Sequence, residues 1–375
     1  MILSYLSLFL AGYALLRFVL PMNHGFFVKL LTAAALIAAS LKFQIYRWFG
    51  GFFFAPDLPR PAVLCLEWAY AALVFLVTML FVRDVLLGLF WIGRRAGMSW
   101  RMPAATDRQR TMLILAAILL SGFGVWQSIR VPDIRTIEIA VPNLAKRLAG
   151  FTIIQLTDLH IGPLLKKDWL QAVVEKTNAQ HPDIIAITGD MIDGSPEKLK
   201  DEVLPLKDLS ARYGVYGVTG NHEFYHDADA WSAAFGELGV VMLKNEHRTI
   251  TVGESNLVIA GVPDAVAKRF NATLPNAETA LKDAPDGVRI LLAHRPTEGP
   301  QTGVTLQLSG HTHGGVMFFL KPIVAAFNQG FIEGLYECDG KMIYVSPGTG
   351  LWNGFSCRIG VPAEITRFIL KTAKP

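Results

Sequence analysis

Five short polar motifs occur in order along the second half of this 375-residue chain. They carry carboxylate, imidazole and amide side chains in the number that two divalent metals require, and each directly follows an apolar run that predicts a β-strand. The motifs are Asp158-Leu159-His160, Gly189-Asp190, Gly220-Asn221-His222-Glu223, Ala293-His294 and Gly310-His311-Thr312-His313. Because α/β sheets keep their reactive groups at strand ends, the pattern predicts a dinuclear metal site.

The spacing within the motifs favours shared ligation. Asp158 and His160 are two residues apart just past a strand, and in extended backbone such residues point to the same side. Both could therefore reach one ion, and His311 and His313 repeat the spacing. Asp190 ends its strand after a glycine that allows a tight turn, so its carboxylate could bridge two metals.

The ligand types narrow the choice of metal. Asn221 offers a neutral carbonyl oxygen, which supplies a ligand without further reducing the Lewis acidity of the ions. Oxygen and nitrogen ligands without a thiolate suit manganese, iron or zinc and disfavour copper(I). We expect two divalent metal ions as cofactors, with manganese as the first expectation and zinc, iron or magnesium as the alternatives.

The ordered motifs resemble those of the calcineurin-like metallophosphoesterase superfamily, whose pattern is D-x-H, G-D, G-N-H-[D/E], H and G-H-x-H. The similarity covers about residues 150–370, and all five blocks are present. Any one block is weak evidence, whereas the ordered set is specific. Residues 344–350 and 362–366 also resemble the membrane-associated bacterial branch of that superfamily.

The resemblance implies a role for each motif residue. The first metal would be held by Asp158, His160 and His313, the second by Asn221, His294 and His311, with Asp190 between them. His222 is implied as the non-ligand histidine that stabilises the transition state or protonates the leaving oxygen. Glu223 stands where many members have Asp, and its longer side chain would orient His222. Asn221, His222 and Glu223 are thus the implied catalytic group.

The elements that must position these residues alternate along the chain. Apolar segments 151–156, 183–188 and 214–219 predict strands, and helical patterns follow them at 168–179, 196–210 and 228–238. The later segments 240–252, 256–262, 288–293, 304–308 and 342–346 are mostly strand-like. The fold class is therefore mixed α/β, and the resemblance implies a β-sandwich flanked by helices. We expect a catalytic domain over residues 149–375 and a linker over residues 131–148.

The first 130 residues predict an all-α transmembrane domain of about four helices. Hydrophobic residues make up 52% of the chain, and only 18% are charged. The expected spans are 1–20, 30–41, 68–91 and 111–129, of which 30–41 is the weakest because only twelve positions separate Lys29 from Lys42. Glu67 and the neighbouring pair Arg83 and Asp84 fall at or within a span. So few charges favour an anchor, with Glu67 at the interface, over a transport path.

Charge predicts the orientation and excludes one class of partner. Five arginines, at positions 94, 95, 101, 108 and 110, precede the last span. The positive-inside rule then puts this loop in the cytoplasm and residues after 130 outside the plasma (inner) membrane. The first 130 residues carry a net charge of +8 and the whole chain +4, so the second part is acidic. Its acidity argues against a nucleic-acid partner.

Several residues keep two interpretations. Arg295 and, with less support, Arg358 could meet a substrate phosphate or could be structural or rim charges. The apolar segment Val316–Phe327 either lines a hydrophobic mouth or dips into a bilayer, or it is ordinary core. Cys338 and Cys357 could pair in an oxidising compartment or stay unpaired.

Together these features predict a membrane-anchored, metal-dependent hydrolase of ester bonds. Its substrate would be a phosphate ester, and the bond a phosphodiester or pyrophosphate, in a lipid-linked molecule or an envelope precursor. One alternative is a broad-specificity phosphodiesterase that the membrane part merely tethers. Another is a membrane sensor or scaffold with an inactive metallophosphoesterase domain, and the complete ligand set argues against it.

Overall fold

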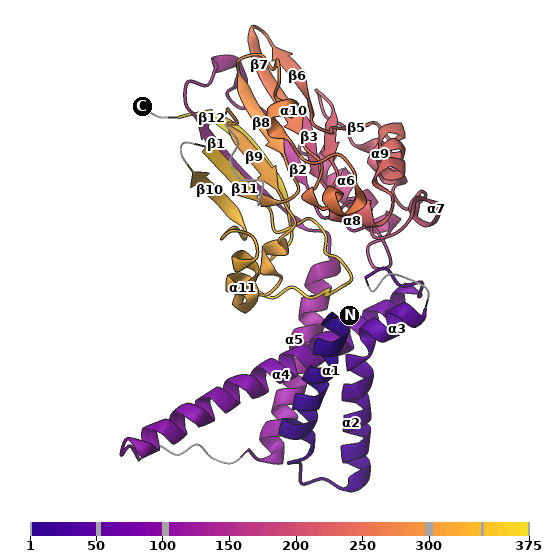
Figure 1. Cartoon of the computed structure of the whole chain (residues 1–375), viewed down its shortest axis with the longest axis vertical. Coiled ribbons are helices and arrows are strands. Elements are labelled where there is room, and N and C mark those ends of the chain that lie inside the picture. Colours follow the sequence, from indigo (N-terminus) through magenta and orange to yellow (C-terminus); the bar gives the residue numbers. More distant parts are fainter. Residues whose placement is uncertain (1, 50–53, 100–104, 297–302, 339–340, 374–375) are drawn as a thin grey trace. The chain divides into compact units, whose positions relative to one another are not determined.

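The chain folds into two compact units. A computed structural model describes residues 2–49, 54–99, 105–296, 303–338 and 341–373. The helical unit comprises Met1–Trp126 together with Asn353–Cys357, and the sheet unit comprises Gln127–Trp352 and Arg358–Pro375 (Figure 1). The short segment 353–357 therefore belongs to the helical unit, although both of its sequence neighbours belong to the sheet unit.

The first sheet of the sheet unit has six strands in the order β1-β12-β2-β3-β4-β5. These strands are β1 (Asp133–Val141), β2 (Thr152–Leu156), β3 (Ile184–Thr188), β4 (Val215–Val218), β5 (Val240–Met242) and β12 (Glu364–Thr372). Strands β2 to β5 run parallel, and β12 pairs antiparallel to β2 and parallel to β1. Three motif-bearing strands thus have their carboxyl ends at one edge.

The second sheet also has six strands, in the order β10-β11-β9-β8-β7-β6. These strands are β6 (Glu246–Val252), β7 (Ser255–Gly261), β8 (Val288–Leu292), β9 (Leu306–Ser309), β10 (Gly334–Cys338) and β11 (Lys341–Val345). Its four inner strands are parallel, and the edge strands β6 and β10 pair antiparallel. The remaining two motif-bearing strands, β8 and β9, lie side by side here.

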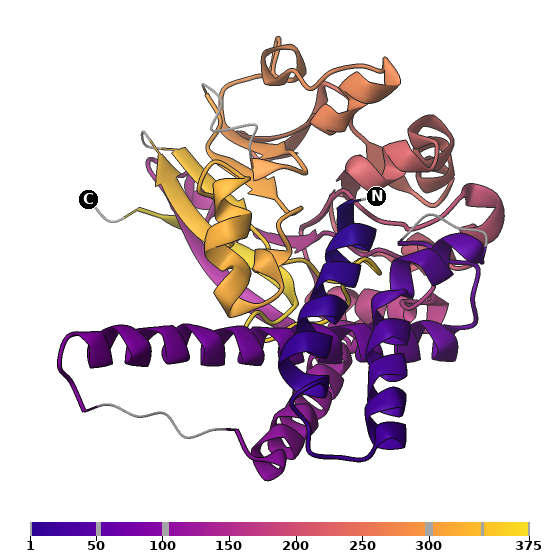
Figure 2. The same ribbon diagram turned by 60° about the horizontal axis from the view of Figure 1, so that its bottom comes forward.

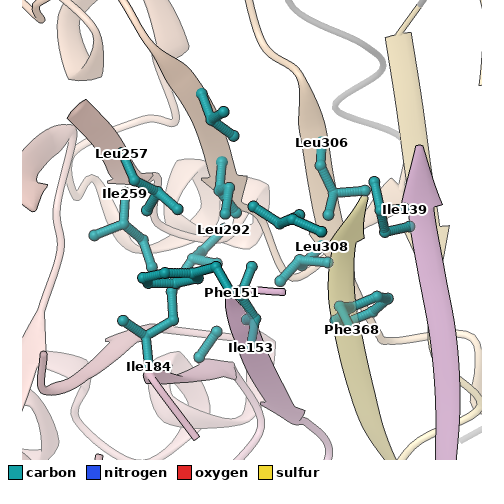
Figure 3. Close-up of a cluster of buried hydrophobic side chains, with 14 of the residues drawn as sticks. Ile139, Phe151, Ile153, Ile184, Leu257, Ile259, Leu292, Leu306, Leu308 and Phe368 are labelled. Carbon is teal, nitrogen blue, oxygen red and sulfur yellow. The ribbon is translucent and has the colours of Figure 1, made fainter. Parts of the chain in front are cut away.

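Apolar side chains from both sheets fill the space between them. Ile153 and Ile184 come from the first sheet, while Leu292 and Leu308 come from the second, and all are fully buried (Figure 3). The other face of the first sheet is covered by α6 (Lys167–Asn178) and α9 (Ala228–Glu237). Because β2 and β3 are buried on both faces, they have continuous apolar runs instead of alternating ones. The fold is the expected mixed α/β sandwich with flanking helices.

The shorter helices connect these layers. They are α7 (Pro196–Leu199), α8 (Asn221–Tyr225), α10 (Ala277–Ala280) and α11 (Lys321–Ala326). The predicted helix over 196–210 is only α7 followed by a 3₁₀ turn at Leu204–Asp208. The predicted strand over 240–252 is two strands, β5 and β6, which belong to different sheets. The expected linker over 131–148 contains β1, whose partner β12 lies more than 200 residues later in the chain.

The helical unit contains all four segments that were predicted as spans. Its helices are α1 (Ile2–Ala14), α2 (Phe26–Ser40), α3 (Lys42–Trp48), α4 (Arg60–Arg95) and α5 (Asp107–Ile129). Helix α1 packs against α2 and α4 (Figure 2). Helices α4 and α5 are long and apolar enough to cross a membrane, and α2 with α3 forms a third candidate bent by 58°. The apolar helix Leu3–Val19 is shorter, so the described helices are consistent with an anchor of two to four helices.

A buried ion pair lies inside the helical unit. Lys42 Nζ is 2.6 Å from Glu67 Oε1, and their side chains are 0% and 1% exposed. Tyr46 donates its hydroxyl hydrogen to Glu67, and the backbone N–H of Ser356 donates to the other carboxylate oxygen. Lys42 also donates to the carbonyl of Gly354. Glu67 is therefore buried inside the helical unit, where Lys42 and the segment 353–357 satisfy its carboxylate.

The other intramembrane charges form a second cluster. Asp84 accepts a 2.6 Å hydrogen bond from the Tyr13 hydroxyl and pairs with Arg17 at 2.5 Å. Arg83 is farther away, with its guanidinium 3.8 Å from Asp84. The main partner of the Asp84 carboxylate is therefore Arg17, and Arg83 is a secondary one.

Breaking the buried pair should destabilise the helical unit. A Lys42→Met variant leaves Glu67 buried without its cation, which costs about 3–5 kcal/mol in comparable cases. The double variant Lys42→Met/Glu67→Gln should recover part of the loss, because glutamine is neutral and can still accept from Tyr46. Thermal unfolding of the full chain in lipid nanodiscs measures both. Strictly additive losses across the double-mutant cycle would contradict a direct coupling.

Candidate metal centre

The five motifs lie where their strands end. Asp158 and Asp190 come two residues after β2 and β3, and Asn221 begins α8 three residues after β4. His294 and His311 come two residues after β8 and β9. Each sheet of the sandwich therefore contributes part of the site.

The backbone at these positions is not extended. The motif residues with left-handed φ are Asp158 at 54°, His160 at 46°, Asp190 at 52°, His311 at 69° and His313 at 50°. The sequence argument from i and i+2 in an extended chain was therefore wrong in its geometry, although the side chains do converge. Left-handed non-glycine residues are uncommon and cluster at functional sites.

Two glycines of the motifs allow the strand ends to approach one another. A Cβ at Gly220 would overlap the carboxylate and backbone nitrogen of Asp190, and a Cβ at Gly310 would overlap Thr157 and the Asp158 carboxylate. At Gly220 the clash includes backbone, which no side-chain rotation relieves. Both glycines thus allow close packing, and Gly310 does so between strand ends of the two sheets.

The first group of converging side chains is Asp158, His160 and His313. The Nε2 atoms of the two histidines are 3.3 Å apart. Asp158 Oδ1 lies 3.4 Å from His313 Nε2 and 3.8 Å from His160 Nε2. All three residues are buried, so few waters can satisfy these atoms.

The second group is Asp190, His294 and His311. His294 Nε2 is 3.2 Å from both Asp190 Oδ2 and His311 Nδ1. The same Asp190 oxygen is 3.9 Å from His160 Nε2 of the first group. Asp190 therefore lies between the two groups, as a bridging carboxylate must.

Two histidine tautomers follow from the hydrogen bonds. His294 Nδ1 is 2.8 Å from the Thr188 carbonyl, which can only accept, so this nitrogen carries the hydrogen. In His160, Nδ1 lies 3.0 Å from Asp193 Oδ1 and donates in the same way. Each ring then turns Nε2 toward carboxylate oxygens. A proton or a metal ion must lie between Nε2 and these oxygens, and the oxygen and nitrogen donors suit a divalent metal.

The protein groups keep the carboxylates in the ligating form. Burial raises the pKa of Asp158, but the imidazoles of His313, His160 and His294 outweigh it and hold that pKa well below its usual range. For His313, burial lowers the pKa to about 3. Burial also lowers the pKa of His294, but the nearby carboxylates, Asp190 above all, raise it to about 10. The carboxylates around His294 therefore stabilise positive charge at this ring.

Asp193 is a residue that the sequence analysis missed. Its Oδ1 accepts from His160 Nδ1 at 3.0 Å and from His222 Nδ1 at 2.5 Å, and its side chain is fully buried. The imidazoles of His160 and His222 hold the pKa of Asp193 well below its usual range, although burial raises it. The sequence did contain a signal for this role, since Asp193 lies three residues past Asp190 in an apolar stretch. A carboxylate that is buried there requires hydrogen-bond donors.

His222 lies beside the converging groups. Its Nε2 is 3.8 Å from Asp190 Oδ2, and its ring is 8% exposed. The rings of Tyr225 and Trp352 pack against it at centroid distances of 5.5 and 6.2 Å. With Nδ1 held by Asp193, Nε2 is the atom that can exchange a proton with a substrate.

Glu223 has a different place from the one implied for it. Its carboxylate accepts backbone N–H groups of Gly220 at 2.7 Å, Met191 at 2.7 Å and Asp190 at 3.0 Å. Glu223 thereby ties the start of α8 to the turn after β3. The orientation of His222, which was assigned to Glu223, belongs to Asp193.

Asn221 and the two arginines complete the site. Asn221 Oδ1 accepts from Arg295 Nη2 at 3.2 Å, and Arg295 Nε donates to Asp264 at 2.8 Å. The Arg295 side chain is 25% exposed, so a substrate can reach it. Arg358 is fully buried and donates to the carbonyls of Pro347, Gly350 and His313, which makes it structural. Cys357 is buried and free, and the side chain of Cys338 lies outside what the structure describes.

A two-sheet α/β sandwich with clustered aspartates and histidines at its strand ends agrees with a metal-dependent phosphoester hydrolase. The family model of calcineurin-like phosphoesterases matches residues 151–315. The chain belongs to that family, as its relatives also show. A transmembrane protein with a metallophosphoesterase domain from Bos taurus is 33% identical, over 81% of this chain and 73% of its own.

Two further relatives agree. A protein of the same description from Danio rerio is 32% identical over 72% of this chain, and the match spans 65% of that protein. An uncharacterized metallophosphoesterase from Campylobacter jejuni is 34% identical over 71% of each chain. The relatives described as transmembrane proteins agree with the apolar helices in supporting membrane integration.

Removing the Asp193 carboxylate should weaken the site without unfolding it. An Asp193→Asn variant loses the charge that holds Nδ1–H on both His160 and His222, and such losses reduce metal affinity or activity by about 10–100-fold. Metal titration by calorimetry and steady-state hydrolysis test this. Asp201→Asn, at an exposed position, is the matched control. Unchanged affinity and unchanged kcat in Asp193→Asn would contradict the positioning role.

Proposed function

We propose that this chain is a membrane-anchored phosphoesterase with a dinuclear metal centre that hydrolyses a phosphodiester or pyrophosphate bond. The proposal rests on the two groups of converging side chains that meet at Asp190. Asp190 belongs to the second group with His294, and the same carboxylate oxygen lies 3.9 Å from His160 Nε2 of the first group. Asp158, His160 and His313 would hold one ion, and His294, His311 and Asn221 the other. A sensor or scaffold with an inactive domain is disfavoured because no ligand position is degenerate.

The chemistry follows from these positions. Two bound divalent ions supply a metal-activated water and neutralise the phosphoryl oxygens. His222 Nε2, adjacent to Asp190 and backed by Asp193, gives a proton to the leaving oxygen. Arg295, held by Asp264, meets the charge of the phosphate from the rim. No covalent nucleophile is needed.

The proposal also includes the identity of the metal, the side of the membrane on which the sheet unit lies, and the substrate. A donor set of carboxylates, imidazoles and one amide favours manganese, with zinc, iron or magnesium as alternatives. We propose that the sheet unit lies on the extracytoplasmic side of the plasma (inner) membrane, because the arginines before α5 favour a cytoplasmic loop there. In that setting, a phosphate ester in a lipid or an envelope precursor is the favoured substrate. A broad-specificity phosphodiesterase that is only tethered is the second candidate, and nucleic acid is not expected as a partner.

Removing the Asp190 carboxylate should reduce metal binding and hydrolysis together. An Asp190→Ala variant should bind fewer than two ions and lose hydrolysis by about 100-fold or more, the scale for losing one electrostatic stabiliser. Elemental analysis gives the metal content, and a screen of lipid and nucleotide phosphates with Mn, Zn or Mg gives the activity. Asp201→Ala is the matched control. A folded Asp190→Ala protein that retains hydrolysis would overturn the proposal.

Arg295 should contribute to substrate recognition. An Arg295→Ala variant should lower kcat/KM by about tenfold or more, the equivalent of one hydrogen bond to a charged group. The metal content should stay at the wild-type value, which separates this effect from damage to the Asn221 ligand. Arg248→Ala, on the exposed strand β6, is the control charge. An unchanged kcat/KM would make Arg295 a rim charge only.

A further inference from the structure

The segment that follows the last predicted ligand presents an apolar face to solvent. It comprises a 3₁₀ turn at Phe318–Leu320 and helix α11 (Lys321–Ala326) (Figure 1). Phe318 is 59% exposed, Ile323 57% and Phe327 83%. These are three of the eight large exposed hydrophobic side chains among the described residues of the sheet unit, and they fall within ten positions of sequence.

The spacing gathers these side chains on one side. Phe318, Pro322 and Ala326 are four residues apart, as are Ile323 and Phe327, and all five are exposed. Residues four apart lie on the same face of a helix. We call this set the 318–327 face. It contains no polar side chain, which is unusual for a surface that meets only water.

A partly buried ion pair ties the segment to the chain that follows it. Lys321 Nζ is 2.5 Å from Glu333 Oε1. At the end of α11 the Asn328 side chain is buried and donates to the Val324 carbonyl, which closes the last turn of the helix. Both ends of the short helix therefore have polar contacts, and the exposed side chains between them are apolar.

The segment is also joined tightly to the loop that carries His311 and His313. Phe318 N donates to the Ile359 carbonyl at 3.0 Å, and Thr312 Oγ1 donates to the Ile332 carbonyl at 2.5 Å. Between them Val316, a β-branched residue, has φ 54°, a conformation that persists only where the surroundings impose it. The 318–327 face is thus rigidly placed relative to the candidate metal centre.

The length of the connection to the anchor favours a bilayer as the partner. Helix α5, long and apolar enough to span, ends at Ile129, and β1 begins at Asp133. The intervening chain reaches about 14 Å at most. The sheet unit therefore begins next to the membrane surface, where a lipid interface is always present. A face rich in Phe and Ile, without net charge, suits the boundary between headgroups and acyl chains.

We propose that the 318–327 face inserts into the lipid–water interface, so that the sheet unit itself contacts the bilayer in addition to its anchor. The contact does not depend on hydrolysis. If the proposed function holds, it also specifies the substrate class: because the face is fixed to the His311–His313 loop, it would keep the metal centre at headgroup depth. Such a placement suits amphiphilic phosphate esters that lie in the bilayer, and these are the proposed substrates.

The test measures membrane depth in the full chain. Single cysteines at Phe327 and Ile323, in a background with Cys65, Cys338 and Cys357 replaced by alanine, are labelled with an environment-sensitive fluorophore. The protein is reconstituted into phosphatidylcholine–phosphatidylglycerol vesicles. We expect blue-shifted emission and strong quenching by doxyl-labelled lipid at both positions. Leu274→Cys, 51% exposed elsewhere in the same unit, should show neither.

Two results would overturn the proposal. Emission and lipid quenching at Phe327 and Ile323 equal to those at Leu274 would show a face exposed to water. A blue shift without lipid quenching would show that another protein surface, such as a second copy of the chain, covers the face. Since neither readout requires turnover, failure of the proposed hydrolytic function leaves the test intact.

A second pair of measurements tests the link to substrate. In an Ile323→Ser/Phe327→Ser variant, hydrolysis of a soluble chromogenic diester should stay within about twofold of wild type, because neither residue touches the metal ligands. Hydrolysis of a phosphate ester embedded in vesicles should fall by about tenfold, as expected for lost apolar burial at the interface. Equal effects on both substrates would remove the link between the face and the substrate class.

Discussion

The central constraint in this structure is electrostatic: buried carboxylate oxygens and imidazole nitrogens crowd together around Asp190. The Thr188 carbonyl and the Asp193 carboxylate each accept the Nδ1–H of one imidazole, so His294 and His160 turn Nε2 to the centre. Burying these carboxylates is costly unless a proton or a metal ion lies between them and the ring nitrogens. The other contacts of the site hold these side chains in place for cations.

The fold meets this constraint by drawing on both sheets. The first sheet supplies Asp158 and Asp190, the second supplies His294 and His311, and the two sheets are joined by a large apolar core. Left-handed turns at the ligands and glycine at positions 220 and 310 let strand ends approach more closely than ordinary turns allow. The stable interior thus offsets the strain and desolvation concentrated at one edge.

The polar motifs and the apolar runs before them were enough to predict the mixed α/β class and the residues that come together. The contacts that bring these residues together were harder to predict, because they join residues that are distant in the sequence. Asp193 and Glu223 acquire their roles from partners about thirty residues away, on a neighbouring strand end. Strand β1 lies in the segment assigned to the linker, although Ile137, Ile139 and Val141 alternate with other residues as in a half-buried strand. Its pairing with β12 could not be predicted from local pattern.

In the helical unit, too, the partners of a charged residue could not be predicted from the local sequence. By composition, Glu67 resembled an interfacial charge, yet it is buried with Lys42 and accepts the backbone N–H of Ser356. Lys42 in turn binds the carbonyl of Gly354. These two backbone groups belong to a segment between Trp352, which packs on His222, and Arg358, which holds the His313 carbonyl. A boundary drawn at residue 131 would separate polar groups that satisfy one another inside the helical unit. A division by sequence position alone therefore misses residues 353–357, which belong to the helical unit through contacts with residues far away in the chain.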